Sequence, residues 1–240
     1  RRLDRGNFSN VFPVYHLYSL MGTTKKVKSQ KLKVKSFLLR IWPVLVILGL
    51  VVVFAFPYWA KNKVPFPADQ LVTAFPPWQY YYGLPVKNGA MPDVVTQMYP
   101  FKHLVIGLWK NGQIPLWNPY NFSGNPLLGN YQSAVFHPAN FLFFFLPEID
   151  AWSLLILFQP LLAGLFTYFF CRQLKLSQIR SLLAAIAFMF CGFMTVWLAY
   201  GTMSWVLLWL PLVLWAIEKN FEKLTAGSLM LISFSLTASF

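Results

Sequence analysis

The sequence predicts an all-α integral membrane protein: a multi-span helical bundle with a large outer loop, carrying interfacial helices, between spans one and two. Three observations lead to this prediction. The composition is 57% hydrophobic and only 11% charged, and its apolar tracts are too long for the core helices of a soluble protein. Lysine and arginine gather at one end of these tracts. A Pro- and aromatic-rich stretch separates the first two tracts.

The first two spans follow from length and apolarity. Phe37–Trp59 is apolar apart from Arg40 and would measure about 30 Å or more as a helix, enough to cross a bilayer. Ala151–Cys171 is the second such tract. We therefore expect spans at 37–60 and 151–171, with the outer loop 61–150 between them.

The third apolar tract, Ser181–Ile217, is too long for one crossing, because it would measure about 55 Å as a helix. Tyr200-Gly201-Thr202 is its best turn, so we expect two spans, 181–200 and 203–217. A fifth span, 225–240, begins after 218–224 and is cut off at Phe240. The chain is thus expected to be an N-terminal fragment of a longer protein.

Charge predicts the orientation. The formal net charge is +13, but fifteen of the twenty basic residues lie in the N-terminal segment 1–36, at Arg40, and in the loops 172–180 and 218–224. Short basic loops on one side are the positive-inside pattern. We therefore expect a multi-pass membrane protein with a cytoplasmic N-terminus. The run of basic residues at Lys25–Arg40 is better explained as a topology signal in contact with anionic membrane lipids than as a nucleic-acid-binding segment.

Two acidic residues of the outer loop stand in matching contexts. Asp69 is followed six residues later by Phe75 and then by Pro76, and Asp93 in the same way by Tyr99 and Pro100. Carboxylates are scarce in so apolar a chain, and a passive connector does not need two of them placed alike. If the chain catalyses a reaction, this loop is where we expect its chemistry.

A helix is expected directly after the second motif. Pro100–Asn111 begins with proline and is followed by Gly112. Its apolar residues recur at helical spacing, while Lys102, His103 and Lys110 lie off the apolar stripe. We therefore expect an amphipathic helix over 100–111 that lies in the bilayer interface. Phe141–Leu146 is expected to be a second interfacial element.

Three segments of the loop carry a family resemblance: Pro92-Asp-Val-Val-Thr-Gln-Met-Tyr-Pro, Pro115-Leu-Trp-Asn-Pro-Tyr with Phe122-Ser-Gly, and Gln132-Ser-Ala-Val-Phe-His-Pro. Over about Pro65–Pro147 the chain resembles the YfhO-like bacterial membrane proteins. That family is similar to the GT-C superfamily of multi-spanning glycosyltransferases, which use polyprenyl-phosphate sugars and hold an essential acidic residue in the first outer loop. The resemblance implies a glycosyltransferase of the cell envelope, acting on a glycan, lipid or protein acceptor.

The resemblance also implies site residues. Asp93 matches the family's acid and is the candidate general base; the alternative is an N-cap of a short helix. Asp69 is either a site residue, orienting the acceptor or helping to hold a divalent cation, or a turn residue. Apart from that possible cation, no cofactor or metal is indicated. His137 stands where the family more often has an aromatic residue and is left out.

Five further residues are candidates for substrate binding. Lys102 and His103 are expected to contact the donor phosphate, with a solvated basic face as the alternative. Gln97, Trp117 and Asn118 match the family motif and are expected to line a sugar site, although packing explains them equally well.

Two other functions stay open. The chain fits a subunit of a lipid-linked glycan flippase or transporter, although its expected spans hold almost no ionisable residues. It also fits a non-catalytic membrane scaffold. Neither accounts as well for the paired acidic motifs beside an expected interfacial helix.

Overall fold

The computed structural model describes residues 39–222 and 226–238. The chain divides into two compact units, Arg1–Leu45 and Val46–Phe240, and the arrangement below is that of the second. The basic segment 1–36 lies outside the described residues. The described part is mostly helical, and its β-structure is one antiparallel pair of two-residue strands, β1 (Trp117–Asn118) and β2 (Asn125–Pro126).

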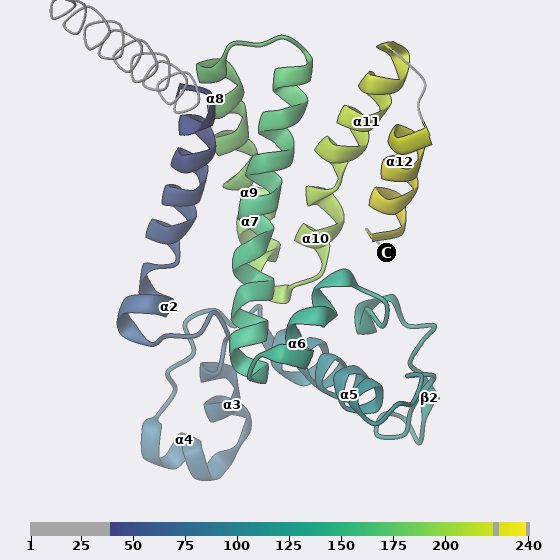
Figure 1. Ribbon diagram of the computed structural model, residues 1–240. Helices are drawn as coiled ribbons and strands as arrows, with labels where there is room; N and C mark the ends of the chain where they lie inside the picture. The colour runs from purple at the N-terminus through teal and green to yellow at the C-terminus, as the bar shows by residue number, and fades with distance from the viewer. Residues whose placement is uncertain (1–38, 223–225, 239–240) are drawn as a thin grey trace, which may run out of the picture. The chain divides into compact units, whose positions relative to one another are not determined.

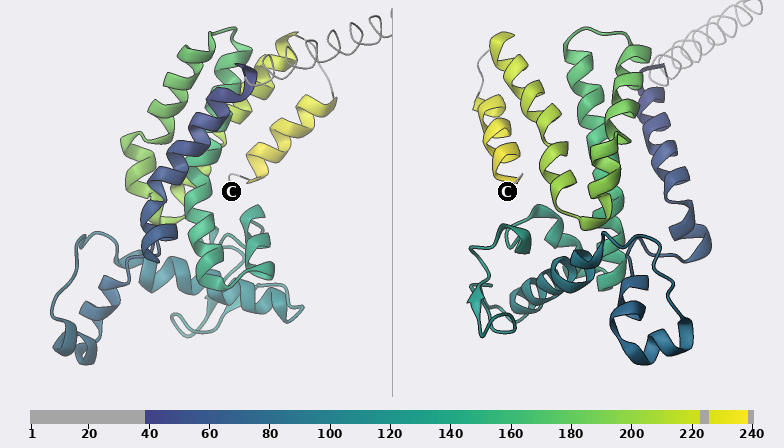
Figure 2. Two further views of the ribbon diagram at one scale, coloured as in Figure 1. Left: turned by 60° about the vertical axis from the view of Figure 1, so that its left-hand side comes forward. Right: turned by 180° about the vertical axis from the view of Figure 1, so that it is seen from behind.

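One long helix organises the second unit. The 26-residue helix α7 (Glu148–Gln173) packs against α8 (Gln178–Met189) and α11 (Leu210–Glu222). These helices run side by side in all views (Figures 1 and 2). Gly164 permits close packing, because a Cβ atom there would lie 2.9 Å from Met189 Sδ and 3.1 Å from Ile47 Cγ2.

Pro160 lies inside α7 and removes the backbone donor that Ile156 O would otherwise receive. The neighbouring side chain compensates, since Gln159 Nε2 donates to Ile156 O at 3.3 Å and to Leu198 O at 3.0 Å. The second bond joins α7 to the turn Leu198–Tyr200. A proline is tolerated in a helix with apolar surroundings when a side chain donates to the backbone carbonyl that the proline leaves without a donor.

By length and composition, α7 is one helix able to cross a membrane, and the pair Gln178–Met189 and Gly192–Tyr200, bent by 43°, is a second if it forms one span. The helix Leu39–Phe54 is apolar but shorter. Within the described residues, therefore, one or two segments meet the criteria for a span. Four complete spans stay a prediction.

The tracts expected as spans 181–200 and 203–217 are interrupted in the structure. The first comprises α8 (Gln178–Met189), α9 (Gly192–Trp197) and the 3₁₀ turn η4 (Leu198–Tyr200), with extended backbone at Cys191 between α8 and α9. The second comprises α10 (Met203–Leu208) and α11 (Leu210–Glu222). Pro211, near the start of α11, cannot donate to the preceding turn, which explains the second break. The last described helix, α12 (Ala226–Ala238), packs against α11.

Between the two interrupted tracts the chain turns at Gly201, whose φ is +65°. A Cβ atom there would lie 3.0 Å from Leu155 Cδ2 of α7. Two features therefore favour glycine at this position: the left-handed backbone and the close approach of α7.

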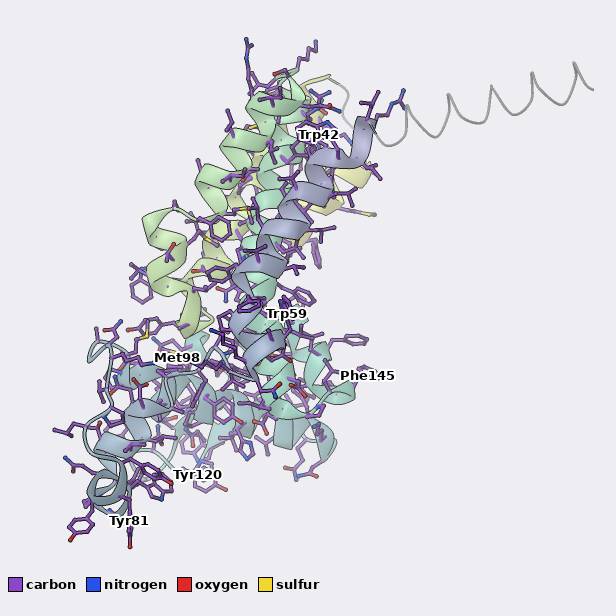
Figure 3. The ribbon with its side chains drawn as sticks, turned by 90° about the vertical axis from the view of Figure 1, so that its left-hand side faces the viewer. Trp42, Trp59, Tyr81, Met98, Tyr120 and Phe145 are labelled. Carbon is purple, nitrogen blue, oxygen red and sulfur yellow. The ribbon has the colours of Figure 1, made fainter. Side chains whose placement is uncertain are left out.

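The expected outer loop folds into two parts on opposite sides of the α7 N-terminus (Figures 1 and 2). One part is small and contains α2 (Phe56–Lys61), α3 (Asp69–Ala74) and α4 (Pro76–Tyr82), which have no buried residues. Tyr81 lies at its tip (Figure 3) and is 79% exposed.

The other part is built on α5 (Tyr99–Lys110), which follows the π-helical turn η1 (Val94–Met98) and crosses the end of α7 (Figure 1). The remaining elements, η2 (Tyr131–Ser133), η3 (Pro138–Phe141) and α6 (Leu142–Phe145), return the chain to α7. Phe145 points away from them (Figure 3).

The structure has a helix where the sequence predicts one over 100–111, displaced by one residue. Its apolar stripe is covered by its own loop: Phe101 and Val105 form a buried cluster with Leu127 and Val135, and Leu104 and Leu108 pack against it. Lipid is therefore not needed to cover this stripe. An interfacial position of α5 stays a prediction.

Candidate functional site

Asp93 lies at the start of the turn that leads into α5. Its side chain is exposed, and within the described residues its carboxylate has no hydrogen-bond or ion-pair partner. The N-cap interpretation therefore fails, since no side-chain capping bond forms and Thr96 Oγ1 instead donates to Pro92 O at 3.0 Å. The carboxylate is free to accept a proton.

The backbone that carries Asp93 is fixed on both sides. Val94 and Met98 are buried, and on the N-terminal side the Tyr200 hydroxyl donates to Ala90 O. Asp93 thus combines an unengaged carboxylate with an anchored position, an arrangement that suits a proton acceptor.

Asp69 is engaged in a different way. It is the first residue of α3, and its Oδ2 accepts from the Lys87 backbone N–H at 2.9 Å. Next to it, Gln70 Nε2 donates to Asn88 O. The two residues close the loop 69–88, so the structure favours the turn interpretation of Asp69.

Lys102, expected on a basic face, is instead buried, with a relative exposure of 6%. Its Nζ donates to Asn140 Oδ1 at 2.6 Å, and Asn140 Nδ2 donates to Ala134 O and Val135 O. Burial lowers the pKa of Lys102 to about 7. The amine thus joins α5 to the returning loop and is withdrawn from the basic face on which it was expected.

His137, which the sequence analysis left out, lies in the same buried region. Its Nδ1 accepts from Ala139 N at 3.2 Å, which leaves the proton on Nε2. Nε2 is buried and unpaired within the described residues, and the ring packs edge-on against Trp205 at 4.6 Å between centroids. Burial and, secondly, the charge of Lys102 lower the pKa of His137 to about 3. The feature of the sequence that could have indicated a structured position for His137 is the His-Pro step at the start of η3.

His103 is paired with a carboxylate. Its Nδ1 lies 2.8 Å and 2.9 Å from the two oxygens of Glu148, at the start of α7. Burial first, and then the charge of Glu148 and a hydrogen bond to it, raise the pKa of Tyr99 to about 12. Glu148, the first residue of α7, therefore connects α5 with α7.

The other three predicted residues have partners within the loop 61–150. Gln97 Nε2 donates to Gln132 Oε1. The Trp117 indole covers Gly124, where a Cβ atom would lie 2.6 Å from its Cζ2. Asn118 is 2% exposed, and its Oδ1 accepts from Tyr120 N at 2.9 Å. Gln97 and Trp117 have evident packing roles, and Asn118 is discussed further below.

Two clefts are lined mainly by residues of the loop 61–150. One, of about 650 Å³, is lined by Asp69, Lys63 and Lys87 over an apolar floor that includes Phe66 and Met91. The other, of about 530 Å³, runs along α5. Within the described residues, no group of three or more His, Cys, Asp or Glu side chains gathers to hold a metal ion.

A family model described as bacterial membrane protein YfhO matches residues 87–239, well over half of the chain. The chain belongs to this family. The resemblance seen in the sequence is thus confirmed at family level, and the match runs beyond the outer loop through α7–α12. It includes Asp93 but not Asp69. No curated protein and no solved structure matches the chain.

Proposed function

We propose that this YfhO-family membrane protein acts as a glycosyltransferase of the GT-C type. It transfers a sugar from a polyprenyl-phosphate donor to an acceptor hydroxyl outside the cytoplasm, with Asp93 as general base. The observation that carries the proposal is the carboxylate of Asp93, which is exposed and unpartnered on an anchored turn, while the matching Asp69 is engaged.

The chemistry needs one proton acceptor. As the acceptor oxygen attacks the anomeric carbon, its proton moves to the Asp93 carboxylate. The bond between the anomeric carbon and the phosphate oxygen breaks, and polyprenyl phosphate leaves with the electron pair. The Asp69 carboxylate already accepts the Lys87 backbone N–H, whereas both oxygens of Asp93 are open to an acceptor hydroxyl, which is why Asp93 is preferred to Asp69.

The proposal includes a topology. Residues 61–150 lie outside the cytoplasm, the N-terminus lies inside, and four complete spans cross the membrane. The positive-inside distribution of Lys and Arg supports this orientation. On this side of the membrane a donor linked to a membrane lipid is the reasonable source of sugar, because no nucleotide-sugar pool is present there.

The donor phosphate is assigned to cations that face open space. Lys102 is buried against Asn140, and His103 is paired with Glu148. Lys63 and Lys87 instead line the 650 Å³ cleft. Its lysines over an apolar floor suit a ligand with an anionic head and a lipid tail.

Asp93→Asn tests the proposal, because asparagine keeps the size of the side chain but cannot accept a proton at neutral pH. We expect transfer from polyprenyl-phosphate sugars, measured in membranes with the full-length protein, to fall about a hundredfold or more. Undiminished transfer would remove Asp93 from the mechanism. If the wild type transfers no lipid-linked sugar but moves one across the membrane, the transporter function replaces this one.

A further inference from the structure

The 530 Å³ cleft along α5 has a composition unlike that of the other cleft. Its volume falls within the range of about 300–1,000 Å³ typical of small-ligand sites. Its polar lining is neutral apart from one histidine, and no Lys, Arg, Asp or Glu of the described residues lines it. The lining residues include His103, Leu104, Leu108, Asn118 and Tyr120.

Asn118 presents an unused donor to this cleft. Its side chain is 2% exposed, and its Oδ1 is occupied by the Tyr120 backbone N–H, which fixes the orientation of the amide. Nδ2 has no hydrogen-bond partner among the described residues. Nδ2 is not among the buried unpaired atoms of the described residues, so it keeps access to the cleft and is open to an acceptor atom of a ligand.

His103 supplies the complementary acceptor. Glu148 holds Nδ1 through both carboxylate oxygens, so in the neutral ring the proton lies on Nδ1 and the lone pair on Nε2. The side chain is 69% exposed, and Nε2 has no partner among the described residues. Glu148 is thus a positioning residue that presents His103 Nε2 as an acceptor.

We propose that this cleft binds a neutral sugar ring of the acceptor glycan. Asn118 donates to a ring hydroxyl, His103 Nε2 accepts from another, and Leu104, Leu108 and Tyr120 contact the apolar face of the ring. The neutral lining indicates the acceptor and not the donor, because the donor sugar is bonded directly to a phosphate that would find no counter-charge here. The inference rests on the proposed transferase function.

Chemical modification of His103 in the membrane-inserted full chain measures occupancy directly. Diethyl pyrocarbonate modifies accessible imidazole nitrogens, and mass spectrometry resolves each histidine. His137, whose Nε2 is buried, serves as an unreactive internal reference. The probes are the methyl glycosides of glucose, galactose, mannose and N-acetylglucosamine, with inorganic phosphate as the anionic alternative.

We expect at least one glycoside to protect His103 and phosphate not to. Asn118→Asp keeps the acceptor for Tyr120 N but removes the donor, and should raise the half-protecting concentration about tenfold. Asn130→Asp is the matched control, because Asn130 Oδ1 makes the same kind of backbone bond, to Gln132 N, outside the cleft. It should leave protection unchanged.

Protection by phosphate alone, no protection by any glycoside, or an unaltered Asn118→Asp variant would overturn the inference. The outcome is independent of catalysis. Asp93→Asn should retain full protection while losing transfer. Protection without any transfer in the wild type would reject the transferase function alone, and transfer without protection would reject this site alone.

Discussion

Two segments with the same sequence pattern have different structures. In the first, α3 ends before Phe75, whose backbone is extended at φ −116° and ψ 107°, and a new helix begins at Pro76. In the second, Tyr99 keeps helical backbone at φ −67° and ψ −47°, and the helix continues through Pro100. The residue before a proline ordinarily avoids helical geometry, so the second motif is the exception.

Packing explains the exception. Tyr99 contacts Phe66 at 5.1 Å and Trp152 at 5.4 Å between ring centroids, and both Val94 and Met98 are buried. The π-helical bond from Tyr99 N to Val94 O shifts the register ahead of the proline. Phe75 is 51% exposed, and the ring contact that it makes within the described residues is with nearby Trp78. Where tertiary contacts are absent, the local preference prevails.

The largest difference in stability is expected between two variants that each replace the aromatic residue of one motif with alanine. Tyr99→Ala removes a side chain packed between Phe66 and Trp152 and should destabilise the protein by about 2–3 kcal/mol. Phe75→Ala, the matched control, should cost about 0.5 kcal/mol, because Phe75 is largely exposed. Thermal unfolding of both variants in the same detergent measures the difference. Equal losses would contradict the packing explanation.

A pH dependence is expected from the buried amine beside the second motif. The pKa of Lys102 is lowered from 10.5 to about 7 in the folded state. At a pH between these two values, the unfolded protein therefore binds more protons than the folded protein. Stability should therefore rise with pH above about 7, by at most about 1.4 kcal/mol per pH unit. His137 stays neutral over this range.

Lys102→Met isolates this contribution, because it removes the amine and retains much of the apolar volume. Melting temperatures of the wild type and the variant are measured from pH 6 to pH 9. The melting temperature of the wild type should rise relative to that of the variant, and equal slopes would mean that the amine is not buried. A wild-type stability that falls across this range relative to Lys102→Met would contradict the burial of Lys102.

The smallest effect concerns the anchor of Asp93. Tyr200→Phe removes the hydroxyl that donates to Ala90 O and should cost about 1 kcal/mol. Hydrogen exchange read by mass spectrometry should become faster over 90–98 and stay unchanged over 69–88, which Asp69 closes. Uniform acceleration of both segments would show that Tyr200 does not anchor the second motif specifically.

The sequence predicted what depends on local pattern. The proline start and glycine end of the helix at 100–111 are local signals, and α5 occupies Tyr99–Lys110. Gly201 lies at the turn indicated by Tyr200-Gly201-Thr202. The helical class and the family likewise follow from composition and motif.

What depends on distant contacts was not predictable. The burial of Lys102 depends on Asn140, 38 residues away, and the pairing of His103 with Glu148 spans 45 residues. Nothing in the two acidic motifs themselves distinguishes the engaged Asp69 from the free Asp93. The difference arises from Lys87, which lies beyond the first motif, and from the packing of Tyr99.

The difference between the two acids is the central claim, and one assay tests it directly. Asp93→Asn and Asp69→Asn are compared for sugar transfer in the same membranes at matched protein levels. Asparagine at position 69 still accepts the Lys87 N–H bond, so we expect near-normal transfer there, against a loss of about a hundredfold or more for Asp93→Asn. Equal activities, or a larger loss for Asp69→Asn, would contradict the account.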